Sequence, residues 1–393
     1  MNDTVHPIRQ PEAGATRSLL LIGPEPPPAT GMELATRALA AELGRAGVPL
    51  KRIDTADPAD ELGNRSRLTS HNIWLALRHV GAAARWSASR SVGVVYVPIA
   101  QNFPALFRDL AFVAMARLAR KRVVLHLHGG AFAAYYRSLP RPLRLILRGI
   151  LGGADLGLVL SDALRPELAC ILPAERIAVV PNGIDLPLPI PRRSGSHEIE
   201  VLFLSVLYRW KGVLVFIEAF ALAHARSPSL RATVAGQWPS EKERLEAVGL
   251  AERLRVVHRL TFPGFVEGDQ KQAVFSNADI FCFASLVPEG HPLVIIEAMA
   301  SALPVVAPAW PGVSATVLDE ETGLLVHAPT AELLAERLVR LAEHPDERDR
   351  LGQAGRRRYE QLYTQAVFGE RVVATLRPVL ALGGVPVPLQ AAT

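Results

Sequence analysis

Short apolar runs alternate with helix-periodic stretches along most of the chain, and this alternation limits the folds that the sequence can adopt. Buried strands that alternate with helices predict parallel sheets covered by helices on both faces. In the first half the runs are SLLLIG (18–23), SVGVVYVP (91–98), RVVLHLHGG (122–130), ADLGLVLS (154–161) and RIAVVPNGID (176–185). In the second half they are EVLFLS (200–205), RATVAG (231–236), RLTFPGF (259–265), ADIFCFAS (278–285), LPVVAP (303–308) and TGLLVH (322–327).

A break in this alternation divides the chain into two parts of similar size. The segment PLPIPRRSGSHE (187–198) has the Pro, Ser and Gly content of a linker, and 393 residues are enough for two domains with separate cores. We expect two doubly wound, Rossmann-like parallel-sheet domains that face a central cleft. The expected parts are a polar tail at 1–17 that is no signal peptide, a first domain at 18–187, a second at 188–365, and at 366–393 a helix packing back toward the first domain plus a tail.

Two glutamates stand eight positions apart in the otherwise apolar segment PEGHPLVIIEAMASALPVV (288–306). A carboxylate removed from water is costly unless partners compensate it, so Glu289 and Glu297 require a binding explanation. The second proline of the segment suits the first turn of a helix, and the free N–H groups from Gly290 to Leu293 would form an anion site. This arrangement fits a ligand with a central diphosphate and hydroxylated rings at both ends, such as a nucleotide sugar. The alternative is a surface glutamate and a core glutamate paired with an arginine.

A basic pair precedes a helix in LYRWKGVLVFIEAF (207–220). Arg209 and Lys211 stand just before Gly212, and cations beside a helix N-terminus can bracket a diphosphate and stabilise the charge on a departing nucleotide. A solvated basic loop is the alternative interpretation, since basic residues near turns are common.

A glycine opens the first predicted helix in PPPATGMELA (26–35). Thr30 and Glu33 have the spacing of a capping box, and Gly31 would let a phosphate approach the backbone closely. A well-capped helix without a ligand would look the same.

Two histidines alternate along RVVLHLHGGAF (122–132). The period of a strand places His126 and His128 on the same face. We predict that His128, at the carboxyl end next to two glycines, lies at the mouth of the cleft, and that His126 is a hydrogen-bonded core residue.

Taken together, these segments resemble glycosyltransferase family 4, whose members have the two-domain GT-B fold. PEGHPLVIIEAMASALPVVA is similar to the E-x7-E segment of that family, and residues 321–359 are similar to the family's next downstream segment. VVPNGID (179–185), VLFLSVLYRWKG (201–212) and TVAG (233–236) match in order and spacing, so the resemblance covers roughly 18–375. It implies a retaining glycosyltransferase that moves a sugar from a nucleotide diphosphate to an acceptor hydroxyl, in polysaccharide or glycolipid biosynthesis. The first domain would lie on the acceptor side and the second would bind the nucleotide sugar.

The resemblance also implies roles for single residues. Glu289 would contact hydroxyls of the donor sugar, Glu297 would hold the ribose, and His128 would lie near the reacting sugar. Family members often carry an arginine where this chain has Val206, so Arg209 either substitutes for it or faces solvent. The expected catalytic residues are His128, Glu289, Lys211 and Arg209, and the expected donor-binding residues are Gly31, Gly290, His291, Pro292, Leu293 and Glu297.

Other function classes have less support in the sequence. There is no D-x-D segment, no phosphate-binding G-x-x-x-x-G-K-[ST] and no G-x-G-x-x-G, and we expect neither a metal nor a cofactor. A nucleotide-sugar epimerase of the same architecture remains the main alternative. A nucleic-acid-binding protein would explain the pI near 9.5, but no basic stripe with interleaved aromatic residues is present. Two separate cysteines, Cys170 and Cys282, indicate a reducing compartment, so we expect a cytoplasmic protein.

A basic stretch in the first half suggests where the acceptor comes from. YYRSLPRPLRLILRGILGG (135–153) carries Arg137, Arg141, Arg144 and Arg148, and its prolines favour a helix that starts near Pro142. Basic amphipathic helices can lie on anionic membranes, each cation adding about 1 kcal/mol. From the residues alone, a core helix with a solvated basic face is the simpler interpretation. The resemblance favours membrane contact, because many members of the family elongate lipid-linked sugars at the cytoplasmic leaflet. With it we expect peripheral contact with the inner face of the plasma membrane and a sugar or lipid-linked acceptor.

Overall fold

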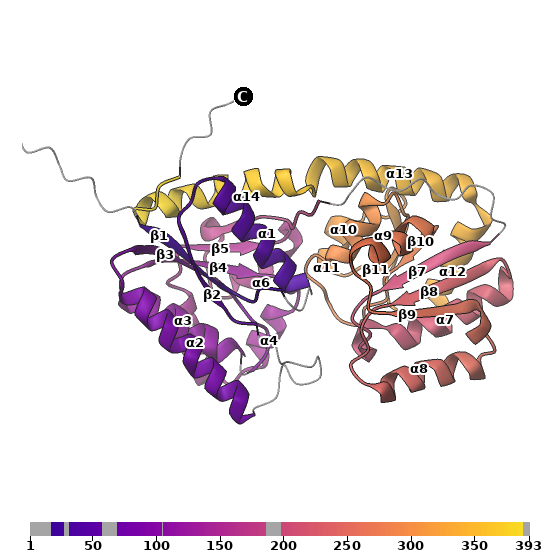
Figure 1. The fold of residues 1–393 in the computed structure, drawn as a ribbon, viewed down its shortest axis with the longest axis horizontal. Helices are drawn as coiled ribbons and strands as arrows, with labels where there is room; N and C mark the ends of the chain where they lie inside the picture. The colour runs from indigo at the N-terminus through magenta and orange to yellow at the C-terminus, as the bar shows by residue number, and fades with distance from the viewer. Residues whose placement is uncertain (1–16, 27–30, 57–68, 104, 186–197, 388–393) are drawn as a thin grey trace, which may run out of the picture.

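The chain folds into two domains, each built on a six-stranded parallel sheet (Figure 1). The structure, a computed structural model, describes residues 17–26, 31–56, 69–103, 105–185 and 198–387. The strand orders are β2-β1-β3-β4-β5-β6 and β12-β11-β10-β7-β8-β9, and every pairing in both sheets is parallel. This confirms the predicted doubly wound α/β architecture. Most of the predicted linker at 187–198 lies outside the described residues, as does Thr30 of the predicted capping box.

The first domain contains all five strands predicted for it and one that was not predicted. The unpredicted strand β2 lies at the sheet edge, and in its sequence LKRID only Ile53 is buried, so it has no apolar run to reveal it. The strands are β1 (Ser18–Gly23), β2 (Leu50–Asp54), β3 (Val92–Pro98), β4 (Arg122–Leu127), β5 (Leu156–Val159) and β6 (Ile177–Val179). The helices are α1 (Gly31–Arg45), α2 (Ser70–Ala88), α3 (Ala105–Leu118), α4 (Phe132–Ser138), α5 (Arg141–Leu151) and α6 (Arg165–Ala169).

The second domain contains all six strands expected from its apolar runs. They are β7 (Ile199–Leu204), β8 (Leu230–Ala235), β9 (Leu260–Gly264), β10 (Ile280–Cys282), β11 (Val305–Pro308) and β12 (Gly323–Val326). The helices are α7 (Val213–Arg226), α8 (Glu241–Arg253), α9 (Gly268–Asn277), α10 (Leu293–Ala300), α11 (Pro311–Thr316), α12 (Ala331–Glu343), α13 (Pro345–Leu362) and α14 (Gln365–Leu382).

The central strands of each sheet are buried on both faces, which explains why they read as continuous apolar runs. In β1, Leu20 and Ile22 belong to one core cluster, whereas Leu19 and Leu21 belong to the cluster on the opposite face. The second sheet divides its strands in the same way between two clusters. Side chains of successive strand residues point to opposite faces, so each domain has three layers.

The last helix joins the two domains. Figure 1 shows α13 and α14 as one yellow band along the top of the molecule, with α14 over the first domain. Its contacts are with α1, β3 and β4 of that domain, and Phe368, Val372 and Leu376 are buried there. The segment after β6 also meets the start of this helix, since the amide of Ile184 donates to the carbonyl of Tyr363 at 3.0 Å.

Proline breaks the basic stretch of the first domain into two helices. Arg137 lies in α4, while Arg141, Arg144 and Arg148 lie in α5, which begins beside Pro140 and Pro142 as predicted. One continuous cationic stripe is therefore absent, because Pro142 is tolerated only in the first turn of a helix.

Candidate active site in the cleft between the domains

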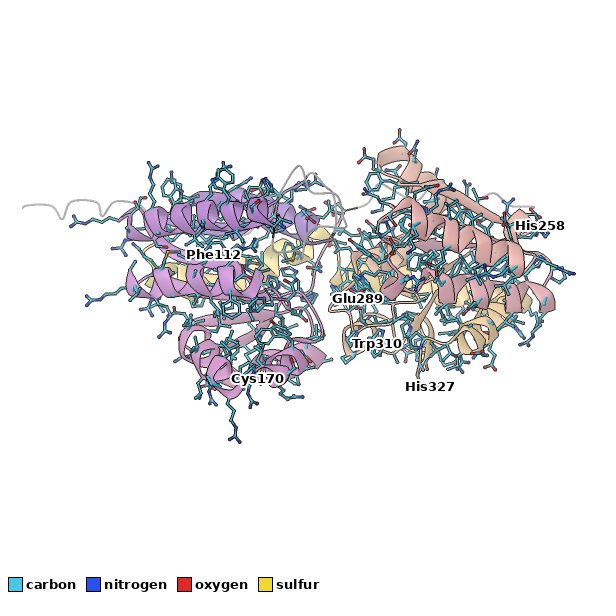
Figure 2. The ribbon with its side chains drawn as sticks, turned by 90° about the horizontal axis from the view of Figure 1, so that it is seen from below. Phe112, Cys170, His258, Glu289, Trp310 and His327 are labelled. Atoms are coloured by element: carbon cyan, nitrogen blue, oxygen red, sulfur yellow. The ribbon has the colours of Figure 1, made fainter. Side chains whose placement is uncertain are left out.

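A cleft of about 1230 Å³ opens between the carboxyl ends of the two sheets. Its walls come from both domains, and Figure 2 shows Glu289 where the two domains meet. Nine of the ten predicted site residues line it: Gly31, His128, Lys211, Glu289, Gly290, His291, Pro292, Leu293 and Glu297.

Arg209 is the predicted site residue that the structure does not bring to the cleft. Its guanidinium pairs with Glu246 on α8, and its side chain is 62% exposed. Arg209 and Lys211 belong to one 3₁₀ turn, and in such a turn residues two positions apart point in different directions. The two side chains, which the sequence suggested would act as a pair, therefore point apart. Of the two, only Lys211 faces the cleft.

Lys211 and Glu289 form an ion pair inside the cleft. The Lys211 ammonium donates to a carboxylate oxygen of Glu289, and each side chain is 19% exposed. The Ser285 hydroxyl, at the strand's carboxyl end, donates to the same oxygen at 3.1 Å. The cation and the carboxylate therefore compensate each other.

A left-handed glycine allows this contact. Gly212 has φ of +84°, and a Cβ there would lie 1.9 Å from the carbonyl oxygen of Ala284. Only glycine adopts this conformation without strain and leaves room for the strand end. The turn that carries Lys211 can therefore press against the loop that carries Glu289.

Glu297 is buried in α10 with one oxygen left unpaired. Its other oxygen accepts a hydrogen bond of 2.5 Å from Lys271 on α9. Burial raises the pKa of the Glu297 carboxyl, and the charge of Lys271 lowers it in part. Buried polar atoms are normally satisfied, whereas Oε2 of Glu297, at the cleft wall, has no hydrogen-bond partner among the described residues. Sequence reasoning missed Lys271, because nothing in GDQKQAVFSN sets it apart from an ordinary helix lysine.

His128 lies directly after β4 and is half-buried at the cleft wall. Burial lowers its pKa to about 4, so the imidazole is neutral at neutral pH. Its ring centroid lies 4.0 Å from that of His126, as the period of the strand predicted. His126 is buried and hydrogen-bonds the hydroxyl of Tyr96, which confirms its assignment to the core.

His291 faces the other domain with its side chain. Its Nδ1 accepts from the amide of Asn182 at 3.2 Å, and the Asn182 side chain donates to the carbonyl of His291 at 3.2 Å. Burial, helped by Arg358, lowers the pKa of His291 to about 3, so the ring is neutral and can accept. Asn182 belongs to the segment VVPNGID. The sequence did not indicate that this segment contacts the second domain.

Glycines let the loops of the two domains touch across the cleft. Gly129 and Glu289 form an isolated antiparallel bridge. A Cβ on Gly290 would lie 2.1 Å from the carbonyl oxygen of His128, and one on Gly130 would lie 2.9 Å from that of Glu289. The backbones of the two domains can approach this closely only because glycine has no side chain.

Neither a metal cluster nor a membrane-spanning helix is found in the part of the chain that the structure describes. Among the described residues, no group of three or more His, Cys, Asp or Glu side chains is placed to hold a metal ion. No helix in the described ranges is long and apolar enough to cross a bilayer.

Two family models match the chain over most of its length. The model "Glycosyltransferase Family 4" matches residues 29–187 and "Glycosyl transferases group 1" matches residues 191–358. The putative colanic acid biosynthesis glycosyltransferase WcaL of Escherichia coli is 28% identical over 232 residues, or 57% of this chain and 56% of that protein. The phosphatidyl-myo-inositol mannosyltransferase of Mycobacterium leprae is 30% identical over 192 residues, or 46% of this chain and 49% of that protein. The matched parts span about half the length of these relatives.

Solved structures resemble the chain over nearly all of it. HepE of Anabaena, in complex with UDP and glucose, has a TM-score of 0.69 at 19% identity and covers 92% of this chain and 100% of that one. Sucrose-phosphate synthase from Thermosynechococcus elongatus has a TM-score of 0.73 at 23% identity and covers 93% and 99% of the two chains. At these identities the likeness concerns the fold, and it confirms the GT-B architecture.

Proposed function

Because the chain belongs to the glycosyltransferases of family 4, we propose that it moves a sugar from a nucleoside diphosphate sugar to an acceptor hydroxyl in polysaccharide or glycolipid biosynthesis. The observation that carries the proposal is the position of Lys211, Glu289 and Glu297 around one cleft between the domains. One cation and two carboxylate acceptors, with the start of α10 between the carboxylates, match a diphosphate flanked by two hydroxylated rings. HepE, which shares the fold, was solved with UDP and glucose, and this supports a nucleotide and a sugar in such a cleft.

The donor would lie along α10. Lys211 and the backbone N–H groups at the start of α10 would hold the diphosphate, where the helix dipole favours negative charge. The unpaired oxygen of Glu297 would accept a ribose hydroxyl. Gly31 at the start of α1 would let the backbone of the first domain approach the phosphates, since a Cβ there would meet nothing within 4 Å.

The sugar would be transferred with retention of configuration. Ser285 holds one oxygen of Glu289, whose role would be to bind sugar hydroxyls and not to attack the anomeric carbon. The C–O bond to the leaving diphosphate would break first. Its electron pair would stay on the diphosphate, which Lys211 stabilises and which takes the acceptor proton as the new bond forms on the same face. Neutral His128 would contribute hydrogen bonds beside the reacting carbon.

We also propose that neither a metal nor a cofactor takes part. Lys211 and the N-terminus of α10 would supply the positive potential that a metal supplies elsewhere. Transfer in the presence of EDTA should therefore equal transfer with added Mg²⁺ or Mn²⁺.

The acceptor would be a sugar or a lipid-linked sugar reached at an anionic membrane surface. On α5, Leu145 and Ile146 are exposed between Arg144 and Arg148. On α2, Ile73, Trp74 and Leu77 are exposed as well. Helices α2 and α5 both pack against α3, so these side chains belong to one helical layer of the first domain. Exposed apolar side chains flanked by cations are typical of peripheral membrane contact, and we place the protein at the cytoplasmic face.

The decisive experiment combines donors with a Glu289→Ala variant. A thermal-shift panel of UDP-, GDP- and ADP-sugars identifies the base, because ligands that bind the folded state stabilise it. Glu289→Ala should abolish transfer while nucleotide affinity stays largely intact. Loss of nucleotide binding, with transfer surviving at saturating donor, would contradict the proposed roles. Conversion of the donor without any acceptor would indicate an epimerase instead.

A further inference from the structure

A second pocket, of about 370 Å³, lies at the amino ends of the strands of the first sheet. Its walls include residues at the starts of β3, β4 and β5, namely Gly93, Arg122 and Asp155. The carboxyl ends of these strands point to the cleft, so the two sites lie at opposite ends of the strands of one parallel sheet. The remaining wall comes from Arg17, just before β1, and from the C-terminal ends of α3, α5 and α14.

Cations dominate this pocket. Among the described residues that line it, Asp155 is the only acid, while five side chains are basic: Arg17, Arg117, Arg120, Lys121 and Arg122. Arg122 pairs with Asp155 at 2.7 Å, which leaves an excess of four positive charges. The C-terminal ends of three helices, α3, α5 and α14, lie at the cations and contribute about half a negative charge each. The helix ends therefore offset less than half of the excess, and the pocket stays cationic.

Backbone carbonyls hold two of these cations in place without neutralising them. The Lys121 ammonium donates to the carbonyls of Ser89 and Val92, both at 2.8 Å. Arg117 donates to the carbonyls of Gly149 and Ile150 at 2.5 and 2.9 Å. An ammonium has three donors and a guanidinium has five, so both retain donors for a ligand. Burial lowers the pKa of Lys121, and the positive charge of Arg17 lowers it further.

Arg120 is held in the pocket at a conformational cost. It has φ of 55° after the end of α3, in the left-handed region that disfavours side chains with a Cβ. Glycine is the usual residue at such a helix end. Its side chain is exposed, and no partner for it appears among the described residues. The Arg120 guanidinium therefore keeps its donors for a ligand.

We propose that this pocket is a second anion site, which binds the phosphate group of a small molecule such as inorganic diphosphate. A phosphate group accepts charged hydrogen bonds from several donors at once. A di- or trianion matches the excess positive charge that remains after the helix ends are counted. The site is separate from the donor cleft, so its occupancy does not depend on the proposed transfer reaction.

The test uses two arginines in the same conformation. Arg255 has φ of 59° after the end of α8 in the second domain, and its amide donates to the carbonyl three residues back, as that of Arg120 does. Arg120→Gly and Arg255→Gly should both raise Tm in phosphate-free buffer, because glycine relieves the strain. Arg255→Gly is therefore the matched control for charge and backbone.

Titration calorimetry with inorganic diphosphate at constant ionic strength measures the site. All proteins carry Lys211→Ala as a background substitution, so that binding in the cleft is weakened alike. We expect Arg120→Gly to lose at least about tenfold in diphosphate affinity, as for one charged hydrogen bond, and Arg255→Gly to lose none. Arg17→Ala, which removes a cation from the other wall, should weaken binding too.

Equal diphosphate affinity in the Arg120→Gly and Arg255→Gly proteins would overturn the proposal, as would a parent protein that binds neither diphosphate nor phosphatidic-acid vesicles. Sedimentation with phosphatidic-acid vesicles provides the second arm. If vesicle binding depends on Arg120 while free diphosphate does not bind, the phosphate group belongs to a lipid headgroup and not to a soluble ion.

Discussion

Closure of the two domains depends on Gly290, and replacement by alanine should prevent it. The added Cβ would lie 2.1 Å from the His128 carbonyl oxygen, about 1.3 Å closer than an ordinary contact of 3.4 Å. Backbone stands on both sides of this contact, so no side-chain rotation relieves it. The loops must separate by about 1 Å, and a misplacement of that size can reduce the rate of a positioned reaction about a hundredfold.

The assay compares steady-state transfer rates with thermal stability. We expect Gly290→Ala to lower kcat about a hundredfold while Tm changes little, because neither domain core is touched. Gly130→Ala provides a graded comparison, since its Cβ would lie 2.9 Å from the Glu289 carbonyl oxygen and needs a smaller shift. Gly81→Ala in the middle of α2, where a Cβ meets nothing within 4 Å, should leave kcat unchanged and stabilise by about 0.5–1 kcal/mol.

The order of the three variants is the critical result. Transfer by Gly290→Ala within about threefold of the parent rate, which is less than 1 kcal/mol, would show that catalysis does not need this approach of the domains. A fall in Tm as large as the loss of a core side chain would show instead that the substitution disrupts the second domain.

Three further predictions concern the Lys271–Glu297 pair, the basic residues of α5 and the metal independence of transfer. Lys271→Met removes the cation that lowers the raised pKa of buried Glu297, so the acid limb of the kcat/KM profile should move to higher pH. The stability of this variant, followed by thermal unfolding, should fall more steeply than that of the parent as pH rises above the ordinary value of 4.5, because ionised Glu297 is then buried without its cation. The double variant Arg144→Glu, Arg148→Glu should no longer co-sediment with anionic vesicles. If the parent protein binds anionic vesicles no more strongly than neutral ones, membrane docking is refuted. Transfer should persist in EDTA, and a metal requirement would contradict the role given to Lys211.

The strands could be predicted because of where they lie in the sheets. Central strands of a parallel sheet are buried on both faces and must be apolar along their whole length, so β3 and β11 are plain in the sequence. The edge strand β2 buries one residue and carries charges, and it therefore has no such pattern. The E-x7-E spacing was predictive for a related reason, since a carboxylate in an apolar segment needs a partner.

The partners themselves could not be predicted, because they come from distant elements. Glu297 meets Lys271 across two helices, and His291 meets Asn182 across the two domains. Each partner is a common residue in an ordinary local pattern, so only the folded arrangement distinguishes it. The error over Arg209 has a local cause, since one 3₁₀ turn decides which of two neighbouring cations faces the cleft.

The ion pair between Lys211 and Glu289 links the binding of the two ends of the proposed donor. When a diphosphate takes the Lys211 ammonium, Glu289 loses the cation that compensates it, although its side chain is only 19% exposed. A largely buried carboxylate then needs a hydrogen-bond donor, and hydroxyls of the transferred sugar are such donors. The intact donor would satisfy both groups, whereas the nucleoside diphosphate left after transfer would satisfy Lys211 alone. In the proposed reaction, re-formation of the Lys211–Glu289 pair would therefore favour release of the spent nucleotide over that of the intact donor.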